Sequence, residues 1–244
     1  MEGYGEDTYG ESFADVYDDW YHDVSRVDAT VERLRALGGD GPYLELGIGT
    51  GRLALPLADT GARVVGIDSS AAMLQRLAAK DSNGRVRAIA GDMIDDLPHE
   101  KFRVAFIAYN TLFNLTSVER QRRLFEVVRS RLDDGGVFVV EAFVPDPKRA
   151  AGSTVTVRTM STDRLVLLAD VHDPSAQTVD GQFVEFTDGD QVRLRPYRIR
   201  YSTPAELDRM ARETGFELRS RTEDMAGAPF DDDSPTHVSV YCRA

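Results

Sequence analysis

Cysteine is almost absent from this sequence, and that absence excludes several kinds of structure. Only Cys242 is a cysteine among the 244 residues, so no disulfide bond can form within the chain. A metal centre held by several thiolates is excluded for the same reason, and we expect no metal site. Hydrophobic residues make up 42% of the chain, which is ample for one sizeable core.

Long apolar runs and an excess of basic residues are also lacking. No hydrophobic stretch is long enough to cross a bilayer, and the acidic start, MEGYGEDTYG, is unlike a signal peptide. We therefore expect a cytoplasmic protein with no membrane partner. The 41 acidic and 29 basic residues give a net charge of −12, which disfavours nucleic acid as a substrate.

Residues 41–143 alternate between predicted strands and helices. The apolar strands show little polar alternation, which is typical of a parallel sheet covered by helices on both faces. Thr116 and Glu119 fit a capping box for a helix that we expect to end at Gly135-Gly136. The predicted strands are 43–46, 63–68, 86–92, 102–110 and 135–143, and the predicted helices include 27–37, 52–61 and 70–80.

The pattern changes after Pro147. Four β-rich segments separated by turn-like DP, DG and DGD sequences predict an antiparallel insertion that covers one side of the sheet. Thr203-Pro204-Ala205-Glu206 then begins a helix with a capping box, and two closing strands follow. We predict a single domain made of an N-terminal cap (1–40), a core (41–147), a β insertion (148–201) and a closing segment (202–244).

The stretch YLELGIGTGR, residues 43–52, is the most informative motif. A tight turn from a strand into a helix presents unpaired backbone N–H groups, and glycine lets a ligand lie against that backbone. The third glycine comes one residue too early for the dinucleotide pattern G-x-G-x-x-G. Glu45, inside the strand, offers nothing to a pyrophosphate but would attract a positively charged ligand. The motif therefore favours a zwitterionic, cationic cofactor such as S-adenosylmethionine.

Three further fragments follow this motif in order: VVGID ending at Asp68, Gly91-Asp92-Met93 and Tyr109-Asn110-Thr111. Together the four fragments resemble the motifs of the class I S-adenosylmethionine-dependent methyltransferases. The resemblance implies a Rossmann-like, mostly parallel sheet with an antiparallel last strand. It implies that Asp68 takes the ribose hydroxyls, that Ser69 and Met73 lie beside the adenine, and that Asp92 accepts from the adenine amino group. The residues that it places at the cofactor are Tyr17, Tyr21, Glu45, Gly47, Ile48, Gly49, Gly51, Arg52, Asp68, Ser69, Met73, Gly91, Asp92, Met93, Tyr109, Asn110 and Thr111.

The N-terminal stretch TYGESFADVYDDWY is rich in aromatic residues at helical spacing, which fits a helix packed on the core. It is also similar to the opening of the sugar N,N-dimethyltransferases, where this segment caps the cofactor and a β insertion builds the acceptor pocket. Tyr9 and Tyr17 are therefore candidates for contact with the methyl donor or the acceptor. That group has a histidine soon after the fourth strand, where this chain has Asn114, and asparagine cannot act as a base.

A sulfonium methyl group is already activated, so the protein needs chiefly to position the acceptor and exclude water. The catalytic candidates are Tyr9, Tyr17, Asn114 and Glu141, of which Glu141 is the leading carboxylate. The sequence does not identify a general base. The best-supported function is methyl transfer to nitrogen or oxygen of a small molecule in a biosynthetic pathway. Two alternatives stay open: a non-methylating enzyme on the same fold and, with less support, a nicotinamide-dependent oxidoreductase. The sequence also allows a homodimer.

Overall fold

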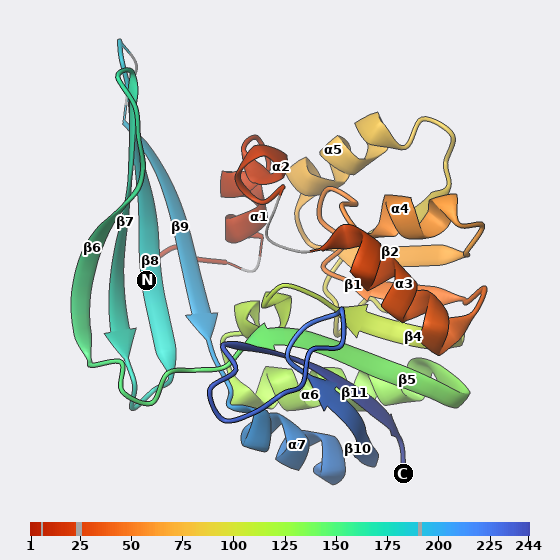
Figure 1. Ribbon diagram of the computed structural model, residues 1–244. Helices are drawn as coiled ribbons and strands as arrows, with labels where there is room; N and C mark the ends of the chain where they lie inside the picture. Colours follow the sequence, from red (N-terminus) through yellow and green to blue (C-terminus); the bar gives the residue numbers. More distant parts are fainter. Residues whose placement is uncertain (6, 23–25, 190–191) are drawn as a thin grey trace.

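The computed structural model describes residues 1–5, 7–22, 26–189 and 192–244, and it contains two β-sheets (Figure 1). The larger sheet has seven strands in the order β10-β11-β5-β4-β1-β2-β3. The neighbours from β5 to β3 pair in parallel, whereas β11 is antiparallel to both β5 and β10. Its strands are β1 (Tyr43–Leu46), β2 (Val64–Asp68), β3 (Val86–Ala90), β4 (Phe102–Ile107), β5 (Leu132–Phe143), β10 (Phe216–Thr222) and β11 (Thr236–Arg243).

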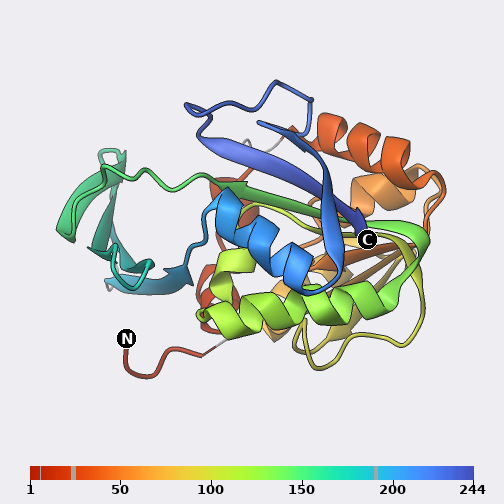
Figure 2. The same ribbon diagram turned by 90° about the horizontal axis from the view of Figure 1, so that it is seen from below.

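Helices cover both faces of this sheet (Figures 1 and 2). One face packs against α6 (Val118–Arg131) and α7 (Pro204–Glu213), which contribute Phe125 and Leu207 to the first core cluster. The other face packs against α3 (Val27–Gly38), α4 (Ala54–Asp59) and α5 (Ala71–Lys80), which form a second core cluster with the sheet. The predicted layered α/β architecture, with its antiparallel last strand, is confirmed.

Some predicted element boundaries are confirmed and others are wrong. The capping box that begins α7 is present, with Thr203 accepting from the Glu206 N–H. The box predicted for α6 is wrong, because Ser117 is the N-cap and accepts from the Arg120 N–H. That helix ends at Arg131, since the chain enters β5 at Leu132, ahead of the glycine pair.

Two further helices differ from expectation. The helix after the glycine motif begins at Ala54, because positive φ angles carry the chain away from helical geometry through Gly51. The aromatic N-terminal stretch forms two short helices, α1 (Thr8–Phe13) and α2 (Tyr17–Trp20), where a continuous helix was expected. Within the described ranges, no helix combines the length and apolarity that crossing a bilayer requires.

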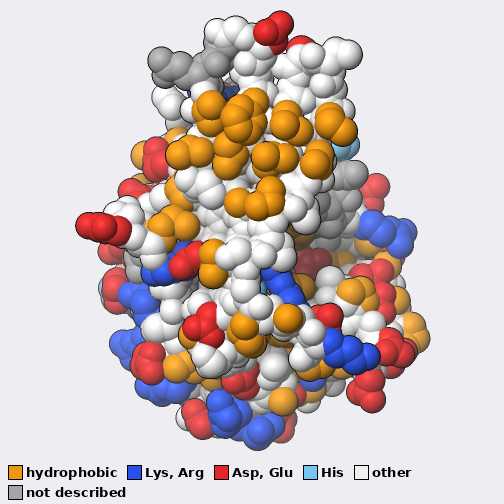
Figure 3. Space-filling model, turned by 90° about the vertical axis from the view of Figure 1, so that its left-hand side faces the viewer, with side chains coloured by type: hydrophobic (Ala, Val, Ile, Leu, Met, Phe, Trp, Pro, Cys, Tyr) orange, Lys and Arg blue, Asp and Glu red, His pale blue; other side chains and the backbone are white. Residues whose placement is uncertain are grey.

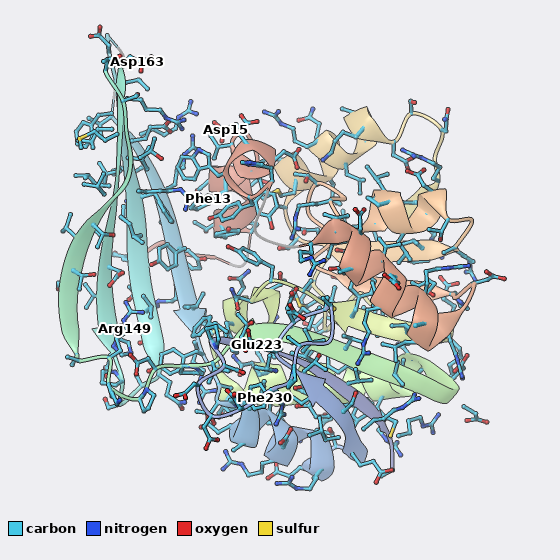
Figure 4. All side chains as sticks on the ribbon, in the orientation of Figure 1. Phe13, Asp15, Arg149, Asp163, Glu223 and Phe230 are labelled. Carbon is cyan, nitrogen blue, oxygen red and sulfur yellow. The ribbon has the colours of Figure 1, made fainter. Side chains whose placement is uncertain are left out.

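The predicted insertion forms a separate antiparallel sheet of four strands, β6 (Gly152–Met160), β7 (Arg164–Asp173), β8 (Thr178–Thr187) and β9 (Arg193–Arg200). One face of this sheet packs against the N-terminal cap, with Phe183 edge-to-face on Phe13 at 5.5 Å. Figure 4 shows Phe13 and Asp15 where the cap lies beside this sheet. Three parts of the chain that are distant in sequence therefore meet around the cap: the core, the cap itself and the insertion.

Candidate functional site

The glycine motif lies where β1 ends, and each of its glycines has a positive φ angle. A Cβ atom on Gly47 would come within 2.4 Å of the Thr111 Cγ2, and one on Gly51 within 2.3 Å of the Leu77 Cδ1. Gly49 differs, because nothing lies within 4 Å of its Cβ position. Gly47 and Gly51 are thus required by close packing within the chain, while Gly49 borders open space that a ligand can use.

The expectation of unpaired amides in this loop is wrong for Gly47, Ile48 and Gly49. The N–H groups of Gly47 and Ile48 both donate to the Ile67 carbonyl, at 2.8 and 3.0 Å. The Gly49 N–H donates to the Asp68 Oδ2 at 2.8 Å. The loop consequently offers a surface without side chains, and the donors that the sequence argument assigned to the ligand hold the loop against β2.

Glu45 is 4% exposed, and its Oε2 has no hydrogen-bond partner among the described residues. Burial raises the pKa of Glu45 to about 8, although Arg52 and the Ala54 N–H act in the opposite direction. Arg52 is its counterpart, since its buried Nε and Nη1 atoms also find no partner in the part of the chain that is described. Its guanidinium lies 5.9 Å from the Tyr109 ring centre. A buried acid and a half-buried arginine whose Nε and Nη1 atoms are buried and unpartnered fit a zwitterionic ligand.

The acids at the ends of β2 and β3 are engaged within the chain. Asp68 accepts from the Gly49 and Ser70 N–H groups, and burial raises its pKa in spite of these bonds. Asp92 accepts from two amides of its own turn and from Arg120 Nη2 at 2.7 Å. Both carboxylates nevertheless border the same cavity.

The cap covers this cavity and is fastened to the core by two acids. Glu11 Oε1 accepts from the Ser70 hydroxyl and from the Ala72 N–H, at 2.9 and 3.0 Å. Asp18 accepts from the Thr50 hydroxyl at 2.6 Å and pairs with Lys80. These contacts hold Tyr9 and Tyr17, the two candidates from the cap, over the strand ends.

The cavity below the cap brings together most of the predicted cofactor residues. It is lined by Tyr9, Gly10, Tyr17, Gly47, Gly49, Asp68, Ser69, Met73, Gly91, Asp92, Met93, Thr111, Asn114 and Leu115. Seven predicted residues lie outside this lining: Tyr21, Glu45, Ile48, Gly51, Arg52, Tyr109 and Asn110. Ile48 is 3% exposed and lies against Gly66, so its side chain belongs to the core.

A second cavity of about 180 Å³ adjoins the first between the cap, the core and the insertion. Its lining is largely aromatic: Tyr9, Tyr17, Tyr21, Tyr109, Asn110, Thr111, Asn114, Phe143, Phe183, Tyr197 and Ile199. Tyr9, Tyr17, Thr111 and Asn114 line both cavities. We call these four residues the shared wall. Three other residues predicted at the cofactor, Tyr21, Tyr109 and Asn110, lie on the side of the second cavity.

The second cavity has no carboxylate and no histidine among its described lining residues. Burial raises the pKa values of Tyr9 and Tyr17, and it raises that of Tyr109 to about 12. Burial and the nearby Asp170 also raise the pKa of Tyr197. These hydroxyls accordingly stay protonated at neutral pH, where they donate hydrogen bonds and do not accept protons.

Glu141 lies in a third cavity, on the other side of Tyr109 and Asn110. Its Oε2 accepts from the Tyr109 N–H at 3.0 Å, and the Asn110 Oδ1 accepts from the Phe143 N–H at 2.7 Å. Tyr109 and Asn110 have φ angles of 47° and 66°, a conformation that costs free energy for residues other than glycine. Glu141 thus contacts the backbone of this strained turn and does not reach the aromatic cavity.

Sequence reasoning missed the part of the aromatic cavity that lies outside the motifs. Phe183, Tyr197 and Ile199 project from β8 and β9, and Phe143 ends β5. The alternation in GQFVEFT and YRIRY was a usable signal, since it shows that one face of each strand is apolar. It does not show that this face meets the N-terminal cap.

Comparison with known proteins agrees with this site. A family model described as a methyltransferase domain matches residues 44–136. The CcbJ methyltransferase from Streptomyces caelestis is 40% identical, with a TM-score of 0.91 over 99% of this chain and 100% of that one. Cypemycin N-terminal methyltransferase from a Streptomyces species is 29% identical over 83% of this chain and 82% of that protein. The amino pentose methyltransferase CalS10 from Micromonospora echinaspora, solved with S-adenosylmethionine bound, shares the fold at 20% identity and a TM-score of 0.67 over 91% of each chain.

The chain belongs to the S-adenosylmethionine-dependent methyltransferases. It is therefore an enzyme whose cofactor is S-adenosylmethionine, as the sequence predicted. The residues present fit this cofactor: the open space at Gly49, the Asp68 carboxylate and the unpartnered buried atoms of Glu45 and Arg52 together suit a ligand with a ribose and a zwitterionic end. The nicotinamide alternative is not supported.

Proposed function

We propose that this enzyme methylates an amine nitrogen of a small molecule bound in the aromatic cavity. The observation that carries the proposal is the shared wall, because it places an acceptor cavity without a base directly beside the cofactor cavity. The acceptor must then be nucleophilic without help from the protein. An amine meets this condition through its free-base fraction, whereas an alcohol needs a base to remove its proton.

S-adenosylmethionine supplies a methyl group on a positively charged sulfur. The residues around it act by holding and shielding: we assign Asp68 to the ribose hydroxyls and Asp92 with Met93 to the adenine. Glu45 and Arg52 are assigned to the ammonium and carboxylate of the methionine end, since each has buried atoms free to pair. Tyr9 and Tyr17, which line both cavities, would exclude water at the point of transfer.

The aromatic cavity suits an amine for a second reason. Rings of tyrosine and phenylalanine attract cations through their faces, so they tolerate the positive charge that the nitrogen gains as it is methylated. Residues 148–201 supply Phe183, Tyr197 and Ile199 to this cavity, and residues 1–40 supply three tyrosines. We assign residues 148–201 to acceptor binding and residues 1–40 to covering both ligands. Residues 41–147 are assigned to the core of the domain, and residues 202–244 to its closing segment.

The relatives support nitrogen as the acceptor atom. The cypemycin enzyme is named for methylation of an N-terminus, and CalS10 is described as acting on an amino pentose. CalS10 is also described as part of calicheamicin biosynthesis. A role in the biosynthesis of a natural product follows as part of the proposal.

The test compares acceptors that differ only at one atom. Matched pairs of small molecules, an amine and the corresponding alcohol, are incubated with S-adenosylmethionine, and release of S-adenosylhomocysteine is measured. We expect turnover of amines only, with kcat/KM rising with pH until the acceptor amine is fully deprotonated. Tyr9→Phe and Asn114→Ala should lower the rate without moving this pH profile, because neither residue takes the proton.

Equal turnover of an alcohol would contradict the proposal. So would a variant of the shared wall that removes one limb of the pH profile, since that behaviour identifies a base in the protein.

A further inference from the structure

Three arginine side chains of the insertion surround the Trp20 ring of the cap, and they differ in their partners. The guanidinium groups of Arg158, Arg195 and Arg164 lie 4.8, 5.4 and 5.5 Å from the ring centre. Arg164 and Arg195 both form ion pairs with Glu185. No carboxylate among the described residues pairs with Arg158, whose Nη2 donates to the Trp20 carbonyl at 2.9 Å. The chain thus neutralises two of these three positive charges but not the third.

The side chain of Arg158 projects from a bulge in β6. Val157 is paired with Leu167 of β7. Thr159 is paired with Val166, so β6 has one residue more than β7 at this point. The extra residue is Arg158, and a bulge of this kind frees its residue from cross-strand pairing. The preceding Val157 is 57% exposed on the outward face of the insertion, where hydrophobic side chains gather (Figure 3). The guanidinium of Arg158 lies on the inner side instead, because it contacts the cap.

Arg158 is exposed, and its guanidinium lies at the rim of the aromatic cavity. It is 5.3 Å from the Tyr21 ring centre and 5.4 Å from that of Phe183, and both rings line the cavity. Its positive charge also reaches Tyr109, where it acts against the rise that burial causes in the pKa of that residue. Tyr21 in turn contacts Tyr17 of the shared wall, with ring centres 4.9 Å apart. A charged donor therefore lies close to the cavity that we assign to the acceptor.

The chemistry of this donor favours an anion. A guanidinium presents its N–H groups in a planar fork that matches a carboxylate. Beyond the bond from Nη2, the nitrogen atoms of Arg158 have no hydrogen-bond partner in the part of the chain that is described. The described lining of the aromatic cavity contains no charged side chain, so recognition of a charge on the acceptor falls to the rim.

We propose that Arg158 binds a carboxylate group of the acceptor. The acceptor is then an amine that also carries a carboxylate, as an amino acid or a peptide does, and the aromatic rings hold the part between the two groups. This inference rests on the proposed function, since it places the acceptor in the aromatic cavity. It does not depend on whether the methylated atom is nitrogen or oxygen, so the two proposals fail separately.

The experiment compares acceptors that differ only in the carboxylate. Dipeptides with a free C-terminus and the corresponding C-terminal amides are incubated with S-adenosylmethionine at about pH 9.5, where the α-amino group is deprotonated. Pairs of hydroxy acids and their amides are included, so that the comparison also covers methylation of a hydroxyl group. Release of S-adenosylhomocysteine gives kcat/KM for each member of a pair. We expect the acid to exceed its amide about tenfold, because only the acid forms a charge-assisted hydrogen bond.

Variants of Arg158 separate recognition from a merely structural role. Arg158→Met should remove the preference by lowering kcat/KM for the acid, while kcat/KM for the amide stays within about twofold of wild type. A structural role would lower both values alike. Arg158→Lys keeps the charge but not the planar fork, so it should retain part of the preference. Arg158→Gln decides the question if the methionine variant fails to fold.

Arg164→Met is the matched control, because it removes a guanidinium from the same Trp20 ring, one that is paired with Glu185. It should keep the preference for the acid, and all variants should bind S-adenosylhomocysteine as wild type does. A wild type that favours no acid over its amide, or that methylates no acid of the panel, would overturn the proposal. So would a preference that Arg158→Met and Arg158→Gln leave unchanged. Weaker binding of S-adenosylhomocysteine by both of these variants would also overturn it, since that result assigns Arg158 to the carboxylate of the cofactor.

Discussion

The cofactor cavity and the aromatic cavity share a wall but are built in different ways. The first is formed mainly by turns that directly follow β1, β2, β3 and β4, and its acids are held by backbone N–H groups. The second depends on side chains that meet only when the cap and the insertion fold over the core. We therefore expect binding of the methyl donor to depend mainly on the core, with Tyr9, Gly10 and Tyr17 of the cap closing the cavity. We expect selection of the acceptor to depend on the contact between cap and insertion.

The largest expected effect concerns the joint between cap and insertion. Arg195, 2% exposed, pairs with Asp15 of the cap and with Glu185 of β8. Arg195→Met removes both ion pairs and the hydrogen bond to the Ser12 carbonyl of the cap, and it leaves buried Glu185 with Arg164 as its partner. We therefore expect the free energy of unfolding to fall by about 3 kcal/mol, at the lower end of the range for breaking a buried ion pair. Urea denaturation measures this change.

Arg193 provides the control for this variant. It pairs with the same Asp15 but is 61% exposed. Arg193→Met should change the free energy of unfolding by less than about 1 kcal/mol, because exposed ion pairs contribute little. Equal effects of the two substitutions would show that the cap is not fastened through the buried arginine.

The next prediction concerns the core alone. Asp68→Ala should weaken binding of S-adenosylhomocysteine about a hundredfold, because it removes the proposed ribose contact and the anchor of the Gly49 N–H. Calorimetry measures the affinity, with Asp232→Ala in an exposed loop as the control. An unchanged affinity would place the ribose elsewhere.

The difference between the two cavities also explains what could be predicted from the sequence. Gly49, Asp68 and Asp92 follow predicted strands directly, so local patterns were enough to place them at one edge of the sheet. The bonds made by the loop amides could not be predicted, because they depend on how closely the turn after β1 packs against Ile67 and Asp68. Ser117 replaced the predicted cap residue Thr116, since two adjacent hydroxyl residues are equivalent in sequence.

Residues of the aromatic cavity were harder to predict for a physical reason. Phe183 and Tyr197 meet Tyr21 only through pairing of strands and packing of the cap, which join segments more than 150 residues apart. Alternation shows which face of a strand is apolar but not what that face contacts. The left-handed turn at Tyr109 and Asn110 gave no signal, because neither residue type demands that conformation.

A smaller effect separates acceptor binding from cofactor binding. Phe183→Leu shortens one wall of the aromatic cavity, so the KM for the acceptor should rise about tenfold while cofactor affinity changes less than about twofold. Steady-state kinetics and calorimetry measure the two quantities. Phe230→Leu, in the loop before β11, is the control and should change neither. A parallel loss of cofactor affinity would show that the two cavities are not independent.

The smallest effect is a pH dependence. The pKa of Glu45 is raised to about 8, so this carboxyl is mostly protonated at neutral pH without ligand. A bound ammonium group favours the ionised form, so affinity for S-adenosylhomocysteine should increase roughly fivefold from pH 7 to pH 8. The pKa of Glu45 is higher in the folded protein than in the unfolded chain. The free energy of unfolding should therefore fall as the pH rises from the unfolded-state pKa toward 8. Glu45→Gln should remove both dependences, and a wild-type affinity that does not vary with pH would contradict this assignment.

A crystal structure with S-adenosylhomocysteine and an amine acceptor bound would show directly whether methyl transfer takes place at the shared wall. We expect the sulfur to lie at the shared wall of Tyr9, Tyr17, Thr111 and Asn114, with the acceptor nitrogen on its far side among the aromatic rings. A sulfur that faces the cavity beside Glu141, with the acceptor bound there, would contradict it.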